Sequence, residues 1–251
     1  MPLFNEKSLV EDYFLEKLQE KGWKYVLADE LERENPEEPL LTHALIRALK
    51  RLNASVGIGD EELKHVLNEL KLRTSGSEDS KKILNYFKEG LPVKFEKERV
   101  VKYVKLFDYE NIVNNDFVIS SQVVHQAGDK QIRHDILLYV NGIPIVNIEC
   151  KNPASLTENW YSAYRQIKEY EKAVPEPFKY IQIGVAAEQT ARYFPTAPWQ
   201  DETLTHQWRE PNKDTVDSII EMLTPETLLN IIRNYLFIRI ERGTTTKVVA
   251  R

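Results

Sequence analysis

The sequence predicts an α/β fold in which a β-sheet is flanked by helices. Two kinds of pattern predict it: apolar residues recur at helical spacing in several segments, and other segments are rich in β-branched and aromatic residues. The chain has 251 residues, of which 42% are hydrophobic. That composition can fill a sizeable core, in one large domain or two small ones.

Helices dominate the N-terminal third of the chain. They are expected at residues 8–21, 42–52, 61–72 and 80–89. The first carries Val10, Phe14 and Leu18 as an apolar stripe, and Thr42 is expected to cap the N-terminus of the second. Residues 74–80 are rich in serine and are expected to form a loop.

The rest of the chain mixes strands with helices. Strands are expected at 92–97, 99–107, 117–124, 136–140, 145–148 and 180–187, and helices at 158–173 and from Thr224-Pro225-Glu226 onward. Pro225 suits the first position of that last helix. Residues 126–130 are expected to form a turn, and the stretch from Tyr193 to Trp208 is expected to be irregular.

A β-hairpin near the middle of the chain is the most informative feature. Asn141-Gly142 separates two β-rich runs, which is a strong hairpin signal. Because side chains alternate across a strand, Glu149 and Lys151 share one face of the second run, while Cys150 lies on the apolar face. A carboxylate and an ammonium at the end of a buried strand are costly to desolvate without a partner, so they indicate a function.

The register of this hairpin decides whether Asp135 can join Glu149. If only Asn141 and Gly142 form the turn, Asp135 lies opposite Ile148 and points away from Glu149. A loop with an odd number of residues places Asp135 opposite Glu149, since a one-residue slip flips the face of every side chain. A shared site therefore requires the odd loop or a bulge.

If they meet, Asp135, Glu149 and Lys151 have the chemistry of metal-assisted hydrolysis. The two carboxylates would supply the hard oxygen ligands that Mg²⁺ prefers, and the metal would polarise a substrate phosphate and activate water. Lys151 would orient that water or stabilise charge developing on the phosphate. A plainer alternative is that these residues merely end strands at the surface, and the short spacing alone favours that alternative.

Several short motifs surround the hairpin. They are Asn115-Asp116-Phe117, Gln122, Arg133-x-Asp135, Val140-Asn141-Gly142-Ile143-Pro144 and Glu149-x-Lys151-Asn152-Pro153. Together they resemble the N-terminal nuclease region of the restriction (R) subunit of type I restriction–modification enzymes, which belongs to the PD-(D/E)XK nucleases. The resemblance is strongest from about 110 to 190. It implies a restriction-endonuclease-like fold with a mixed β-sheet, and Mg²⁺-dependent cleavage of double-stranded DNA.

The resemblance also implies roles at the hairpin. Asp135, Glu149 and Lys151 match the catalytic residues of the family. Asp135, Glu149 and the backbone carbonyl of Cys150 match its metal ligands. Two residues depart from the family pattern, because His134 stands where proline is usual and Cys150 where leucine is usual. Neither position supplies a side-chain ligand in the family, so activity is expected to survive both changes.

Three residues outside the hairpin complete the candidate site. Gln166 and Tyr170 match the family's Q-x3-Y motif, and their i, i+4 spacing puts them on one helix face. Gln166 is expected to turn its amide toward the cluster or DNA, while packing alone could explain Tyr170. Glu11 resembles a third acid at the metal, but Ser8 and Glu11 also fit a capping box. These two interpretations of Glu11 are evenly balanced.

Composition excludes several other classes of protein. No apolar stretch approaches a membrane span, no signal peptide is visible, and a single cysteine suits a cytoplasmic protein. The net charge is −5, and the basic groupings at 64–82 and 94–105 are interleaved with glutamates. We therefore expect these groupings to be solvated faces, and the chain alone to bind duplex DNA weakly and without sequence preference.

The expected organisation is a single nuclease domain over residues 1–251, with a core to about 190 and a C-terminal segment at 191–251. No P-loop motif occurs, so no ATP site is expected in this chain. The segment from Arg242 to Arg251 resembles the approach to the family's ATP-driven translocase, which implies a longer protein that uses ATP. Partners implied by the resemblance are the methyltransferase and specificity subunits. The alternatives are an independent nuclease of the same fold and a docking module that has lost catalysis.

Overall fold

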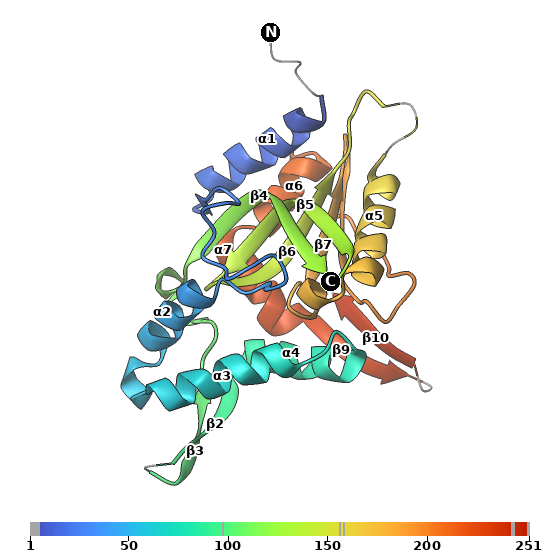
Figure 1. The fold of residues 1–251 in the computed structure, drawn as a ribbon. Helices are drawn as coiled ribbons and strands as arrows, with labels where there is room; N and C mark the ends of the chain where they lie inside the picture. The colour runs from blue at the N-terminus through green and yellow to red at the C-terminus, as the bar shows by residue number, and fades with distance from the viewer. Residues whose placement is uncertain (1–5, 97, 156, 158, 242–243, 250–251) are drawn as a thin grey trace.

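The computed structural model has an α/β architecture, with a mixed six-stranded sheet flanked by helices (Figure 1). It describes residues 6–96, 98–155, 157, 159–241 and 244–249. The predicted fold class is therefore confirmed. None of the described helices is both long and apolar enough to cross a bilayer.

The central sheet carries the hairpin in its middle. Its strands, in spatial order, are β1 (Lys24–Tyr25), β4 (Phe117–Ala127), β5 (Lys130–Val140), β6 (Ile143–Cys150), β7 (Ile183–Ala187) and β8 (Ala191–Pro195). The β1–β4 and β6–β7 pairs are parallel and the other pairs are antiparallel. Two separate hairpins are formed by β2 (Leu91–Phe95) with β3 (Val100–Val104), and by β9 (Leu236–Glu241) with β10 (Thr244–Val249).

Helices cover both faces of this sheet. They are α1 (Glu6–Glu20), α2 (Thr42–Leu52), α3 (Asp60–Leu72), α4 (Ser77–Glu89), α5 (Trp160–Ala173), α6 (Thr215–Met222) and α7 (Pro225–Asn230). Short helical turns lie at Ala54–Val56, Ile112–Asn114, Glu176–Lys179 and Ile231–Tyr235. One face of the sheet packs with α1, α6 and α7 in the larger apolar cluster, and the other packs with α5 in a second cluster.

Most predicted elements are present, with shifted ends, but several local predictions are wrong. Thr42 is the first residue of α2 rather than its cap, and Leu41 holds the cap position without a side-chain hydrogen bond. The expected loop at 74–80 is shorter, because α4 begins at Ser77 and has acidic residues in its first turn, which favour a helix N-terminus. Strand β4 continues to Ala127, so the expected turn at 126–130 shrinks to Gly128 and Asp129.

The C-terminal part is more regular than the sequence suggests. The stretch from Tyr193 to Trp208 was expected to be irregular, yet β8 is an edge strand of the central sheet and a β-bridge joins Tyr193 to His206. The strand is short and has apolar residues on both of its faces, so its sequence lacks the alternation of polar and apolar residues that predicts a strand. Arg242, Gly243, Ala250 and Arg251, in the expected approach to a translocase, lie outside the described residues.

The hairpin turn is the two-residue turn that Asn141-Gly142 predicts. Asn141 has φ 52° and Gly142 has φ 80°, as a turn of type I′ requires. Asn141 is fully buried, and its side-chain nitrogen donates to the carbonyl of Leu106 and to Asn115 Oδ1, each at 2.8 Å. The turn therefore fixes the β5–β6 hairpin to the segments that precede β4.

Candidate active site

A β-bulge sets the register of the hairpin that carries the candidate site. Val140 pairs with Ile143 and Tyr139 with Pro144, but Leu138 pairs with Val146, so Ile145 is an extra residue in β6. The two-residue turn alone would leave Asp135 opposite Ile148. The bulge moves the register by one residue, as a shared site requires.

Asp135 and Glu149 therefore meet where β5 and β6 end their pairing. The last pair of the ladder is Ile136 with Ile148, and the next residues along the two strands are Asp135 and Glu149. The backbone N–H of Cys150 donates to Asp135 Oδ2 at 2.9 Å, so the Asp135 carboxylate lies against β6. The cost of desolvating such groups makes their convergence a candidate functional site.

Lys151 extends the cluster toward α5. Its Nζ lies 4.0 Å from Glu149 Oε1. The side chains of Asp135, Glu149 and Lys151 are almost completely buried, with 1%, 0% and 7% of each residue exposed. Cys150, between Glu149 and Lys151, points into the larger apolar cluster on the opposite face, as alternation predicts. Two carboxylates against one ammonium leave an excess of negative charge.

Helix α5 holds Lys151 through a chain of hydrogen bonds. Lys151 Nζ donates to Gln166 Oε1, Gln166 Nε2 donates to the Tyr170 hydroxyl, and that hydroxyl donates to the Arg133 carbonyl at 3.1 Å. The helix itself starts at a capped end, since Asn159 Oδ1 accepts from the backbone of Tyr161 at 2.9 Å. The Gln166 amide therefore points toward the cluster, as predicted, and contacts Lys151.

Gln122 lies between Glu11 and Asp135, although its place among the motifs gave it no role. Its backbone has φ 55°, which is uncommon for a residue other than glycine. Its Nε2 donates to both carboxylate oxygens of Glu11, at 3.0 and 2.9 Å, and reaches Asp135 Oδ1 at 3.4 Å. A polar residue between Ser121 and Val123 in a strand is a weak signal, so sequence reasoning passed over it.

The start of helix α1 excludes one of the two interpretations of Glu11. Helix α1 begins at Glu6, two residues before Ser8, so Ser8 is not an N-cap and the capping box is wrong. Glu11 joins Asp135 through the Gln122 amide instead. Among the described residues, no three His, Cys, Asp or Glu side chains form a group with the spacing of metal ligands. Glu11 is thus placed beside Asp135 without forming such a group.

His134 is a buried strand residue beside the cluster. Burial lowers its pKa to about 4, so the imidazole is neutral near neutral pH. Its ring packs edge-on against His125, with the centroids 5.1 Å apart, and against Tyr170. The aromatic packing explains how a buried ring is accommodated at this position of the strand.

The donor set of this cluster suits a hard divalent cation. Asp135 and Glu149 offer carboxylate oxygens from adjacent strands, which are the ligands that Mg²⁺ takes. The excess negative charge would favour a cation, and burial would strengthen the attraction. The residues present therefore fit a metal-binding centre with a lysine at its edge.

Removing the Gln166 amide tests the link from α5 to Lys151. For the DNA cleavage that the sequence resemblance implies, Gln166→Ala is expected to lower the rate by roughly ten- to hundredfold, because supporting contacts of this kind typically have effects of that size. The measurement is plasmid cleavage together with the melting temperature. Glu169→Ala, on the exposed side of the same helix, is the matched control. Unchanged cleavage in Gln166→Ala would leave that residue a structural role only.

Comparisons with known proteins match nearly the whole chain. A model of the family described as type I restriction enzyme R protein N terminus matches residues 3–203. The chain is 31% identical over 245 residues to the "Putative type I restriction enzyme MjaVIIIP endonuclease subunit" of Methanocaldococcus jannaschii, covering 94% of this chain and 23% of the relative. It is 26% identical over 277 residues to the type I restriction enzyme HindI endonuclease subunit of Haemophilus influenzae, covering 99% of this chain and 25% of the relative.

Proposed function

Because this chain belongs to the family of type I restriction enzyme R protein N termini, we propose that it is a Mg²⁺-dependent endonuclease domain that cleaves double-stranded DNA. The observation that carries the proposal is the bulge at Ile145, which brings Asp135 opposite Glu149. Lys151 lies at the edge of the same buried cluster. Such a set has the composition that metal-assisted phosphodiester hydrolysis needs.

Each residue of the cluster has a proposed task. Asp135, Glu149 and the backbone carbonyl of Cys150 would hold Mg²⁺, which supplies polarisation of the scissile phosphate and a more acidic bound water. Lys151 orients the attacking water or stabilises the charge that develops on the phosphate oxygens. Its ammonium is a compact donor, and the contact with Gln166 restricts where it can point.

The surrounding residues are proposed to position these groups. Tyr170 fixes the amide of Gln166 and anchors it to β5 through the Arg133 carbonyl. On the other side, Gln122 holds Asp135 and ties it to Glu11. Positions held on strands and helices keep a site more rigid than positions on loops. Glu11 is proposed as a further acid near the metal, acting through Gln122.

The chain spans about a quarter of the length of the curated relatives it matches. We therefore propose that residues 1–251 form the single nuclease domain of a longer cytoplasmic protein, in which an ATP-driven translocase follows. Its partners would be the methyltransferase and specificity subunits of a type I restriction–modification complex. Since those subunits would select the sequence, this chain alone should bind duplex DNA weakly and without sequence preference.

Metal titration of the chain tests the proposed centre directly. Calorimetry with Mg²⁺ or Mn²⁺ should show binding to the wild-type chain, weakened by roughly tenfold or more in Asp135→Asn and Glu149→Gln, because each change removes a charged ligand. Asp129→Asn, at the exposed turn between β4 and β5, is the matched control and should bind as the wild type does. Wild-type affinity in Glu149→Gln would contradict the proposed centre and favour a docking module.

A further inference from the structure

Arg192 lies in a row that runs across the sheet from the candidate active site. Glu149 pairs with Ala186 in the β6–β7 ladder, and Ala186 pairs with Arg192 in the β7–β8 ladder. Adjacent strands lie about 4.8 Å apart, so the Cα atoms of Glu149 and Arg192 are separated by roughly 10 Å. An arginine at the edge strand is therefore close enough to serve the same substrate.

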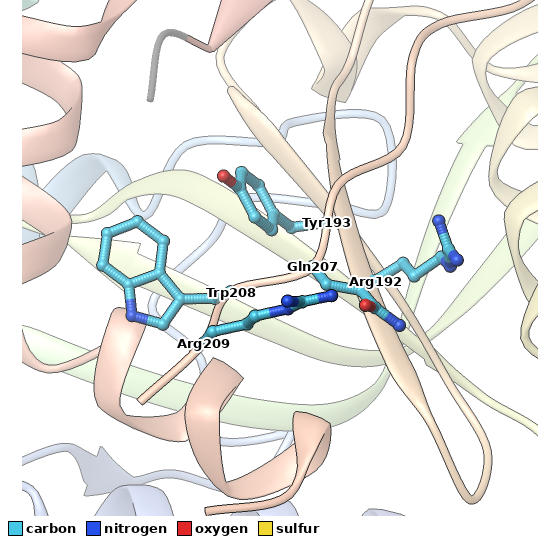
Figure 2. A pocket seen from close by; sticks show the side chains of 5 residues that line it. All are labelled: Arg192, Tyr193, Gln207, Trp208 and Arg209. Carbon is cyan, nitrogen blue, oxygen red and sulfur yellow. The ribbon is translucent and has the colours of Figure 1, made fainter. Parts of the chain in front are cut away.

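The Arg192 side chain lies on the face of the sheet that carries Glu149. Ala186, between them, belongs to the apolar cluster that packs against α5. The Arg192 guanidinium lies 4.4 Å from the ring centroid of Trp160, the first residue of α5, and its Nη1 donates to Thr205 Oγ1 at 3.4 Å. In Figure 2, Arg192 and Tyr193 point to opposite sides of β8. The contact with the Trp160 ring restricts the orientation of the guanidinium before a ligand binds.

A hollow at the edge of β8 brings a second arginine beside Arg192. Its lining consists of Arg192, Tyr193, Gln207, Trp208 and Arg209 (Figure 2). Arg209 is exposed, and the Tyr193–His206 bridge holds its segment alongside β8. Glu210, the next residue in the chain, accepts a hydrogen bond from Trp208 Nε1 at its Oε1, at 2.7 Å.

These two arginines line the same hollow and are available for an anion. Within the described part of the chain, neither Arg192 nor Arg209 forms an ion pair with a carboxylate. Other arginines are paired with carboxylates, namely Arg47, Arg51, Arg73 and Arg233. Within the basic groupings seen in the sequence, Lys71, Lys94 and Lys102 each contact a glutamate. In a protein with net charge −5, two arginines that lack such partners and line one hollow indicate an anionic ligand.

We propose that Arg192 and Arg209 bind backbone phosphates of the DNA strand whose scissile phosphate reaches Glu149. This inference rests on the proposed nuclease function and adds a binding site to it. Given the strand spacing, a phosphate at Arg192 would lie close to the scissile phosphate on the same strand. The planar guanidinium suits phosphate because it can donate two parallel hydrogen bonds.

Fluorescence anisotropy with a labelled duplex tests this site. With Ca²⁺ in place of Mg²⁺ and at low salt, Arg192→Ala is expected to weaken binding about tenfold, because a charge-assisted contact is lost. The salt dependence of log K should become shallower by about 0.9 for that one phosphate. Arg192→Lys should keep the salt dependence and lose part of the affinity. Arg209→Ala, at an exposed position, should weaken binding without affecting folding.

Arg233→Ala is the matched control. Arg233 also stacks on an aromatic ring, at 5.0 Å from the Tyr109 centroid, but it is paired with Glu110 and lies outside the row. This variant should bind DNA as the wild type does. Melting temperatures of all variants separate loss of binding from loss of folding. If Arg192→Ala were unfolded, the DNA affinities of Arg209→Ala and Arg192→Lys would still test whether the two arginines bind phosphate.

Three outcomes would overturn the proposal. The first is that both alanine variants bind DNA with the affinity and salt dependence of the wild type. The second is that the wild-type chain does not bind DNA at low salt. The third is that Arg192→Ala weakens binding of a labelled nucleoside triphosphate but not binding of DNA. The last would mean that the arginines bind a free nucleotide. None of these outcomes would contradict the proposed roles of Asp135 and Glu149 in catalysis. Conversely, full cleavage by Glu149→Ala would overturn the nuclease assignment even where Arg192→Ala weakens binding.

Discussion

Plasmid cleavage by the complete protein, assembled with its partners, is expected to fall by roughly 10³-fold or more when Asp135, Glu149 or Lys151 is replaced by alanine. The two acidic residues are proposed metal ligands, and the lysine ammonium lies 4.0 Å from Glu149 Oε1. Each replacement removes a proposed interaction with the metal or with the reacting phosphate, so we expect it to lower catalysis more than it lowers stability. Lys151→Arg should also be severely impaired, because a broad planar guanidinium cannot replace a compact ammonium beside a metal.

The same variants should keep the other activities of the complex. ATP hydrolysis and subunit association are expected to remain close to wild type, since this chain contains no P-loop motif. The experiment measures plasmid cleavage and ATPase activity on the same preparations. Lys172→Ala is the matched control for Lys151→Ala, because Lys172 lies on α5 but faces solvent and pairs with Asp201. Wild-type cleavage in Glu149→Ala would refute the assignment, and the docking module would then be the better interpretation.

The parts of the site that sequence predicts well depend on local chemistry. The turn at Asn141-Gly142 follows from two residues that tolerate positive φ, and the shared face of Glu149 and Lys151 follows from alternation within one strand. The position of Gln166 follows from helical spacing combined with the resemblance. Each of these inferences uses residues that are close in sequence.

The parts that sequence does not predict depend on contacts between distant segments. From the sequence, the bulge could be stated only as a requirement for a shared site. Whether Ile145 forms the extra residue of the bulge depends on how β6 packs against the core. The role of Gln122 depends on α1, since the residue it binds lies 111 positions earlier in the chain. The row from Glu149 to Arg192 needs the order of β6, β7 and β8, and sequence reasoning did not recognise β8 as a strand.

Gly142→Ala is expected to destabilise the protein by roughly 2–4 kcal/mol, because two separate costs add at this turn. The first is conformational, since an L-residue at positive φ costs about 1–2 kcal/mol. The second is steric: a Cβ at Gly142 would lie 2.7 Å from the Leu41 carbonyl oxygen and 2.9 Å from the Leu45 nitrogen. Backbone atoms cannot move aside as a flexible side chain would.

Gly128→Ala isolates the conformational cost. Gly128 also has positive φ, at 60°, but no atom lies within 4 Å of an added Cβ. Chemical denaturation of both variants should therefore show a loss at Gly142 that exceeds the loss at Gly128 by at least about 1 kcal/mol, the steric part. Because Gly142 connects the two strands that present Asp135 and Glu149, cleavage should fall with stability only in Gly142→Ala. Equal losses of stability in the two variants would show that the turn does not rest tightly on α2, and that the hairpin takes its position from the sheet alone.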